Sequence, residues 1–404
     1  MSSSIFENFI NNDCLYVDKT AFIEHVINEV SDVVLFTRPR RMGKSLNMNT
    51  LAAFLDCKKD TAGLFRGLYI EKSPVFGEIN KYPVIYLSFK DCTPDNYKKE
   101  LKNQIGKLID KYLNPAQMGR ILKNYLDDKN DYSSTIMREL TEILFEVYNK
   151  KPFILIDEYD KPLLDNMLHA DFMEIKAYLV VFLSSSMKDN PYLGKAVFTG
   201  VTRITKENLF SGLNNVKVYD IFKPSAFDAD FSLTEDELAE LVPEDKISAV
   251  REWYNNMRVG GNLLYNIFSV MSYLSDKKAG PQAYWSRTGS EDLLVKLIND
   301  NRASAIINMM ENSSCQTDVL LDHQINMEHL KDSTLCSDAS FYTLAVQAGY
   351  LSFNPTEHSV YKIFIPNKEA RGVWARIILN YRYKGTDAKL AEIFNGIHDI
   401  NTFV

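Results

Sequence analysis

The feature that most constrains the fold of this chain is an apolar run that leads into Gly43-Lys44-Ser45. Residues 33–37 read Val-Val-Leu-Phe-Thr, which is typical of a buried strand, and a helix is expected from about Ser45 to Asp56. A strand, a loop and a helix in this order cradle phosphate groups, because the helix directs its free N–H groups and positive dipole end at the anion. The sequence therefore predicts a nucleotide-binding α/β unit.

The residues of the loop have different expected roles. Gly43 lets the backbone approach a phosphate, Lys44 places an ammonium between the β and γ phosphates, and the Ser45 hydroxyl can ligate Mg²⁺. Arg38 stands where the usual pattern has Gly, and because it precedes Pro39 we expect the loop to leave its strand without a left-handed turn. The predicted binding loop comprises seven consecutive residues: Arg40, Arg41, Met42, Gly43, Lys44, Ser45 and Leu46.

A second apolar run, residues 153–156, stops at the acidic pair Asp157-Glu158. A carboxylate at the end of a buried strand is costly unless a cation or hydrogen bonds compensate it. Asp157 is therefore predicted to hold the Mg²⁺ hydration shell, and Glu158 to orient and polarise the attacking water. The alternative is an acidic turn after an ordinary strand. Asp160 is expected either to pair with a loop arginine or to be a solvated turn residue.

A third apolar run, residues 196–198, ends at Thr199. A polar residue at the tip of a strand between the two motif strands can contact the γ phosphate and the catalytic water, and Thr199 is the candidate. The alternative is a plain strand terminus. Arg203 is predicted to stabilise transition-state charge or to contact a neighbouring subunit, and the alternative is a surface Arg paired with a carboxylate.

Seven segments between about residues 5 and 375 resemble the bacterial AAA-ATPase-like family. They are residues 16–20, 38–45, 82–89, 156–160, 199–204, 210–215 and 365–369. Members resemble archaeal-type and STAND-type ATPases, so the resemblance implies ATP binding at Gly43, Lys44 and Ser45, with Asp157 and Glu158 as the Mg²⁺ and hydrolysis carboxylates. Residues 255–258 and 265–269 depart from the usual family pattern, and we expect the helical lid to pack differently there.

Many members of that family also carry a nuclease-like domain of the PD-(D/E)XK superfamily. Fewer than 40 residues follow Glu369, so we expect this domain to be absent from the chain. The segment Glu174-Ile175-Lys176 has the Glu-x-Lys pattern, but the apolar residues around it have helical spacing, whereas the nuclease motif needs a strand. Cleavage of nucleic acid is therefore not expected.

The expected fold is an α/β P-loop nucleoside triphosphatase, AAA+/ASCE-like, with a three-layer parallel sheet core. Five strands are predicted near residues 33–37, 83–89, 153–157, 196–200 and 216–221. In the AAA+ arrangement the strand that ends at Thr199 would lie between the other two motif strands. The predicted domains are a P-loop ATPase core (1–225), a helical lid (226–290) and a C-terminal, mostly helical and winged-helix-like region (291–404).

Composition narrows the class of protein. The chain has 46 basic and 53 acidic residues and a net charge of −7, which argues against wholesale binding to nucleic acid or an anionic membrane. The five cysteines are scattered, so neither a disulfide framework nor a zinc site is suggested, and a cytoplasmic location is expected. A local basic and aromatic stretch remains, read either as a solvated helix or as a nucleic-acid contact: Arg371, Trp374, Arg376, Tyr381, Arg382, Tyr383, Lys384 and Lys389.

Three functional hypotheses follow from these features. The first is a Mg²⁺-dependent ATPase that works as a conformational switch or motor on an unidentified protein partner or nuclease domain. The second is a STAND-like regulatory module that is latched by nucleotide and has negligible turnover. The third is a nucleic-acid-stimulated ATPase associated with a nuclease. Each of the three hypotheses is compatible with an oligomer. None of them involves a membrane.

Overall fold

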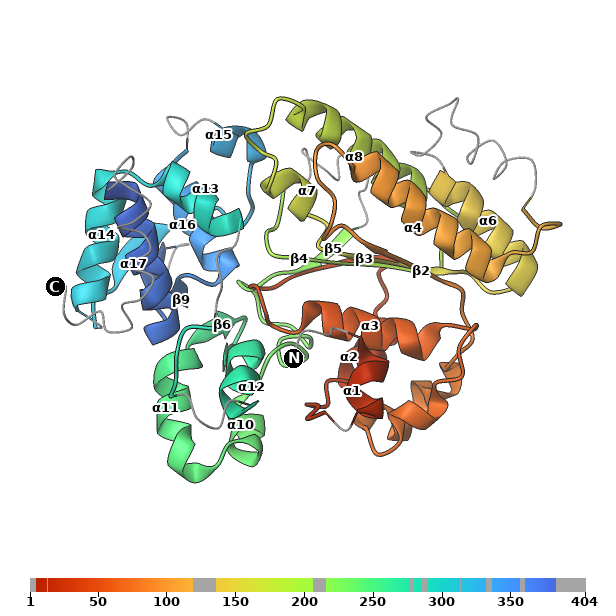
Figure 1. The fold of residues 1–404 in the computed structure, drawn as a ribbon, viewed down its shortest axis with the longest axis horizontal. Helices are drawn as coiled ribbons and strands as arrows, with labels where there is room; N and C mark the ends of the chain where they lie inside the picture. Colours follow the sequence, from red (N-terminus) through yellow and green to blue (C-terminus); the bar gives the residue numbers. More distant parts are fainter. Residues whose placement is uncertain are drawn as a thin grey trace. The chain divides into compact units, whose positions relative to one another are not determined.

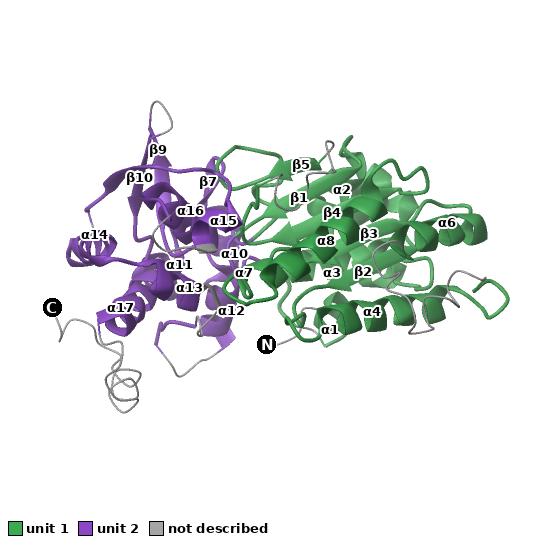
Figure 2. Cartoon of the chain, turned by 90° about the horizontal axis from the view of Figure 1, so that it is seen from above, with its two compact units in different colours: residues 1–38, 43–231 green, residues 39–42, 232–404 purple. Residues whose placement is uncertain are grey.

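The computed structural model describes residues 5–12, 14–118, 136–205, 216–275, 280–284, 289–312, 314–331, 336–356 and 360–382. The resemblance segment 210–215 and the basic residues Lys384 and Lys389 lie outside these ranges. The chain forms two compact units (Figure 2). Unit 1 comprises residues 1–38 and 43–231, and unit 2 comprises residues 39–42 and 232–404.

Unit 1 is built around a five-stranded parallel sheet with the strand order β2-β3-β4-β1-β5. Every residue of β1, β3 and β4 is buried, which explains why these strands read as continuous apolar runs instead of alternating ones. The five predicted strands are therefore confirmed, with small shifts at their ends. Their bounds are β1 Val33–Thr37, β2 Val84–Ser88, β3 Phe153–Asp157, β4 Lys195–Gly200 and β5 Val216–Tyr219.

Helices cover both faces of this sheet, so the expected three-layer α/β core is present (Figure 1). One face carries α1 Phe6–Asn11, α2 Ala21–Asn28 and α3 Lys44–Leu55. The other carries α4 Tyr97–Tyr112, α6 Ile136–Tyr148, α7 Lys161–Leu164 and α8 Phe172–Met187. Three short 3₁₀ segments follow α3: η1 Ala62–Phe65, η2 Tyr69–Lys72 and η3 Pro74–Glu78.

A capping box lies near the start of unit 2: the Thr234 hydroxyl accepts from the Glu237 N–H, and the Glu237 carboxylate accepts from the Thr234 N–H. Its first elements are α10 Glu235–Leu241, α11 Glu244–Tyr254, β6 Met257–Val259, β7 Asn262–Leu264 and α12 Ile267–Ser275. A turn at residues 260–261 joins β6 to β7, and Gly260 has a left-handed φ of 55°.

The rest of unit 2 combines helices with a small antiparallel sheet of order β8-β10-β9. β9 and β10 form an antiparallel pair, and β8, which was not expected from the sequence, pairs with β10 as well. The elements are α13 Gly289–Leu297, α14 Asp300–Glu311, β8 Thr317–Leu320, α15 Met327–Lys331, α16 Asp338–Ala348, β9 Ser352–Pro355, β10 Val360–Phe364 and α17 Lys368–Arg382. The lid and winged-helix assignments, and the division into three domains, stay predictions.

Two functional expectations depend on individual helices. Glu174 and Lys176 lie in α8, which agrees with the helical reading of this Glu-x-Lys segment. Trp374 is fully buried in α17 and its indole N–H donates to the Tyr350 carbonyl at 2.8 Å, so this ring cannot stack on bases. Across the described ranges, no helix has the length and apolar character needed to span a lipid bilayer.

Candidate functional site

The sheet order brings three of the predicted motifs to neighbouring strand ends. As expected, β4 lies between β1 and β3. The phosphate loop follows β1, Asp157 ends β3, and Thr199 is the penultimate residue of β4. Because the strands are parallel, all three motifs lie at the carboxyl ends of the strands, which is where open α/β sheets bind their ligands.

Asp157 is the centre of this cluster. Its Oδ2 accepts a hydrogen bond from the Ser45 hydroxyl at 2.6 Å, and its Oδ1 accepts one from the Thr199 hydroxyl at 2.5 Å. All three side chains thus join in one chain of hydrogen bonds, and the Asp157 carboxylate is buried. A hydroxyl next to a carboxylate is a set of hard oxygen donors, which suits Mg²⁺.

The N-terminus of α3 is arranged to receive an anion. Gly43 precedes the helix with a left-handed φ of 82°, and neither a capping side chain nor an acidic residue lies in the first turn. The buried Lys44 directs its ammonium to the Arg38 carbonyl at 2.9 Å, so the charge lies over the loop. The N–H groups at a helix N-terminus, together with an ammonium over the same loop, match a phosphate chain.

Glu158 is held in a conformation that is rare for its residue type. Its φ is 56°, in the left-handed region that usually favours Gly. Burial raises the pKa of its carboxyl above the ordinary value, and the neighbouring Asp157 charge raises it further. Strained backbone and a raised pKa often occur together at functional sites, and a base with a raised pKa accepts a proton more readily.

Both expectations for Asp160 were wrong. Its carboxylate is buried and accepts hydrogen bonds from the Val201 N–H at 3.0 Å, and from the Thr202 N–H and hydroxyl at 2.7 and 2.8 Å. The Tyr159 hydroxyl also donates to the Thr202 carbonyl at 2.8 Å. Asp160 therefore fastens the segment after β4 to the end of β3, because buried backbone N–H groups need acceptors.

Arg203 lies at the end of this fastened segment. Its guanidinium contacts the buried Asp220 carboxylate at 2.7 Å, just beyond β5. This is the carboxylate pairing that the sequence left as an alternative. A role in stabilising transition-state charge stays a prediction.

Arg38 has a structural role that the sequence did not reveal. Its fully buried guanidinium donates to the Thr37 and Tyr219 carbonyls at 3.0 and 2.7 Å and lies 3.7 Å from Asp228. Burial lowers its pKa to about 10. A Gly at this position has no side chain and could not join β1 to β5 in this way. Tyr219 and Asp228 are far from Arg38 in the sequence, so no local sequence pattern predicts these contacts.

The expectation that the loop leaves its strand without a left-handed turn is confirmed, because neither Arg38 nor the two residues after it have a positive φ. The backbone does turn left-handed within the loop, at Arg41 with a φ of 63° and again at Gly43. The turn is therefore delayed relative to the usual Gly position. The side chain of Arg41 is held by contacts within unit 2.

Residues 39–42, which include the first three residues of the loop, belong to unit 2. The Arg41 guanidinium lies over the Phe268 ring, 4.2 Å from its centroid, and donates to the Tyr284 carbonyl. The Tyr284 N–H donates to the buried Glu369 carboxylate at 2.7 Å, which also accepts from the Ser269 hydroxyl at 2.8 Å. Sequence reasoning missed this network, which links Arg41 to Glu369 through Tyr284.

The remaining loop residues have packing and linking positions. Met42 is buried, and its carbonyl accepts from the Ser232 N–H at 3.1 Å. Leu46 packs against the apolar core of unit 1. The Nε of Arg40 is buried without a hydrogen-bond partner in the part of the chain that the structure describes. Such a group is costly to leave unpaired, so an anion near the loop would be a favourable partner.

Comparison with known proteins agrees with this geometry. A family described as predicted AAA-ATPase matches residues 2–210 of the 404. A relative from Azotobacter chroococcum mcd 1, an uncharacterized protein in the vnfD 5′ region, is 28% identical over 399 residues. The match covers 96% of this chain and 71% of that protein. The chain therefore belongs to the predicted AAA-ATPase family.

Proposed function

We propose that this protein is a Mg²⁺-dependent ATPase that works as a conformational switch on a partner. The observation that carries the proposal is the hydrogen-bonded chain Ser45-Asp157-Thr199 beside the uncapped N-terminus of α3. This arrangement combines an anion cradle with hard oxygen ligands on neighbouring strand ends. Both are needed for a triphosphate and its metal ion.

Each residue of the cluster then has a defined task. Lys44 and the N–H groups of the loop bind the β and γ phosphates, and Ser45 and Asp157 hold Mg²⁺, which neutralises developing charge on the phosphates. Glu158 orients the attacking water and accepts its proton, helped by its raised pKa. The Thr199 and Ser45 hydroxyls both donate to Asp157. Loss of the γ phosphate would therefore change the hydrogen bond of Thr199 through the shared carboxylate.

The switch part of the proposal rests on the division of the loop. Residues 39–42 are grouped with unit 2, and Gly43, Lys44 and Ser45 with unit 1. A loop that rearranges around a triphosphate must therefore act on groups of both units. Within unit 2, Arg41 is the residue through which this effect would pass, because its guanidinium is tied to Phe268 and Tyr284.

The first test is steady-state phosphate release. Removal of the Glu158 carboxylate by Glu158→Gln should lower the rate roughly 10²–10⁴-fold, as expected for loss of a general base. Lys44→Ala should lose both binding and turnover. The matched control is Glu146→Gln, which changes an exposed glutamate on α6 and should leave the rate unchanged. Equal rates in wild type, Lys44→Ala and Glu158→Gln would refute the proposal.

A second candidate function is a nucleotide-latched module with negligible turnover. It is favoured by the contact between Arg203 and Asp220, which engages the arginine that would otherwise serve the transition state. Nucleotide that stays bound through purification, with no phosphate release, would favour the latch. Nucleotide-free protein that turns over ATP rapidly would exclude it.

A further inference from the structure

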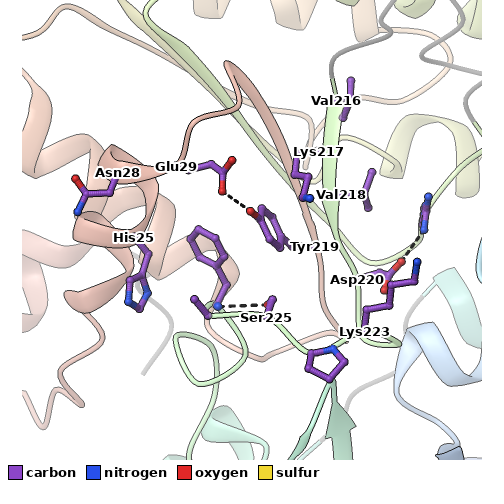
Figure 3. A pocket seen from close by; sticks show the side chains of 14 residues that line it. His25, Asn28, Glu29, Val216, Lys217, Val218, Tyr219, Asp220, Lys223 and Ser225 are labelled. Atoms are coloured by element: carbon purple, nitrogen blue, oxygen red, sulfur yellow. Dashed lines mark hydrogen bonds and ion pairs between the residues drawn. The ribbon is translucent and has the colours of Figure 1, made fainter.

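A hollow of about 530 Å³ lies beside the outer edge of the sheet in unit 1. One wall is formed by β5, and Figure 3 shows His25, Asn28 and Glu29 from the end of α2 on the opposite side. Residues 223–227 close a third side. All four residues of β5 line this hollow, so it follows the strand along its length.

The backbone pattern of β1 shows which groups of the sheet point toward β5. The Arg38 N–H donates to the Gly200 carbonyl of β4 at 3.1 Å. Backbone groups alternate in direction along a strand, so Leu35 directs its N–H and C=O away from β4 and toward β5. Leu35 therefore supplies backbone hydrogen bonds from β1 to β5.

The register then identifies the outward groups of β5. Leu35 is aligned with Val218, and in a parallel ladder a residue bonds with the two neighbours of its aligned partner. Lys217 and Tyr219 therefore pair with β1. Val216 and Val218 direct their N–H and C=O groups outward, and both residues line the hollow.

At the opposite edge of the sheet, the outward backbone groups of β2 are bonded to side chains and are not open to a further strand. On β2, the outward Val84 N–H donates to the Tyr112 hydroxyl at 3.0 Å. The Ser88 N–H and carbonyl both bond with the Gln104 side chain at 2.8 Å. These side chains come from α4 and occupy the groups to which a further strand would bind. Among the described residues, no side chain does the same for Val216 or Val218.

The charges around the hollow favour an acidic occupant. Its two carboxylates are already engaged: Glu29 accepts from the Tyr219 hydroxyl, and Asp220 pairs with Arg203. Lys217 and Lys223 also line the hollow, and no described carboxylate lies within ion-pair distance of either. Because the whole chain carries a net charge of −7, the excess positive charge here is local.

We propose that the outer edge of β5 receives an extended acidic segment of a partner protein, which pairs with Val216 and Val218 as an additional strand. Backbone hydrogen bonds to the edge supply affinity, and alternate side chains supply specificity. The acidic side chains of the segment meet Lys217 and Lys223. Arg203 also lines the hollow, so the docked segment would touch the residues that follow β4.

The test is fluorescence anisotropy with a fluorescein-labelled peptide of alternating Glu and Val. We expect saturable binding that weakens about tenfold in Lys217→Glu and in Lys223→Glu, because each change replaces an attraction by a repulsion. Lys188→Glu, at an exposed lysine that follows α8, makes the same charge change and should have little effect. A peptide of alternating Lys and Val should not bind.

Backbone pairing is tested separately from charge. The Glu-Val peptide with N-methyl groups on alternate amides cannot pair with an edge on that side and should lose binding. Val218→Pro removes one outward N–H, and Pro is tolerated on edge strands, so this variant should also lose binding while the sheet stays intact. If Val218→Pro fails to fold, the methylated peptide still decides the question.

Three results would overturn the proposal. The first is equal binding of the methylated and unmethylated peptides. The second is an equal effect of Lys188→Glu and Lys217→Glu. The third is lysine-dependent binding of a single-stranded oligonucleotide in the absence of peptide binding, which would make the surface a nucleic-acid contact.

Discussion

At the scale of single residues, Gly200 shows how tightly the segment after β4 is packed. A Cβ at this position would lie 2.5 Å from Cε1 of the Tyr159 ring and 2.7 Å from Oδ1 of Asp160. The Tyr159 hydroxyl and the Asp160 carboxylate are the two groups that fasten Thr202. Any side chain at Gly200 must therefore displace them.

Gly200→Ala is predicted to destabilise the protein by about 1–3 kcal/mol, the usual cost of overpacking a filled site. Gly106→Ala is the matched control, because no atom lies within 4 Å of a Cβ built at this helical position. That variant should gain about 0.5–1 kcal/mol, since Ala favours the helix. Urea unfolding of both variants measures the difference. Equal free energies of unfolding for the two variants would show that Gly200 is not tightly packed against Tyr159 and Asp160.

The positions of site residues were predictable where a strand end carries the signal. Asp157 and Thr199 each stand at the end of an apolar run, and Ser45 follows the loop after a third such run, so their proximity follows from a parallel sheet. The long-range partners of Arg38 and Arg41 could not be predicted, because they depend on where distant segments pack. Asp160 was misjudged for a related reason: the N–H groups that it binds come from a neighbouring strand end.

At the scale of elements, α4 is readable from the spacing of its apolar residues, because five of them recur at the period of a helix and so share one face. All five are buried in the structure: Tyr97, Leu101, Ile105, Leu108 and Tyr112. The strand β8 was missed because Thr317-Asp318-Val319-Leu320 is short and its polar residues break any apolar run. It forms because β10 offers it an antiparallel partner, which is a tertiary effect.

The contacts of Arg41 give a prediction for α12. If the loop rearranges around nucleotide, its guanidinium should transmit the change to Phe268, and ATP with Mg²⁺ should slow amide hydrogen exchange in α12. Arg41→Gln should remove this response, because Gln cannot reproduce the charge over the ring. Hydrogen exchange measured with and without ATP tests this.

The control for this experiment is Arg258→Gln. Arg258 belongs to unit 2, but its guanidinium binds the Phe353 carbonyl at 2.8 Å and does not involve the loop. Its response to ATP in α12 should match the wild type. An ATP effect on α12 that persists in Arg41→Gln would show that Arg41 does not carry the coupling.

At the scale of the whole molecule, the two compact units divide after residue 231. This boundary has a physical reason: Phe227 and Phe231 complete the apolar core of unit 1 against Phe22 and Phe36. The change from strands to helices marks the boundary in sequence, but packing decides where the unit ends.

The grouping of residues 39–42 with unit 2 could not be seen from the sequence. From the local sequence pattern, the whole loop would be assigned to the same unit as the strand before it and the helix after it. The decisive contacts join Arg41 and Met42 to residues around 232, 268 and 284. Only the folded chain shows that one loop contributes to both units, and this is the basis for proposing a switch.

The most direct test of the central claim is isothermal titration calorimetry of the folded protein with ATP in the presence of Mg²⁺. The account predicts a heat of binding in wild type, its loss in Lys44→Ala, and wild-type binding in Lys188→Ala, whose lysine lies outside the loop. The contradicting result is a folded wild-type protein that gives no heat with ATP, or Lys44→Ala protein that binds ATP as tightly as wild type.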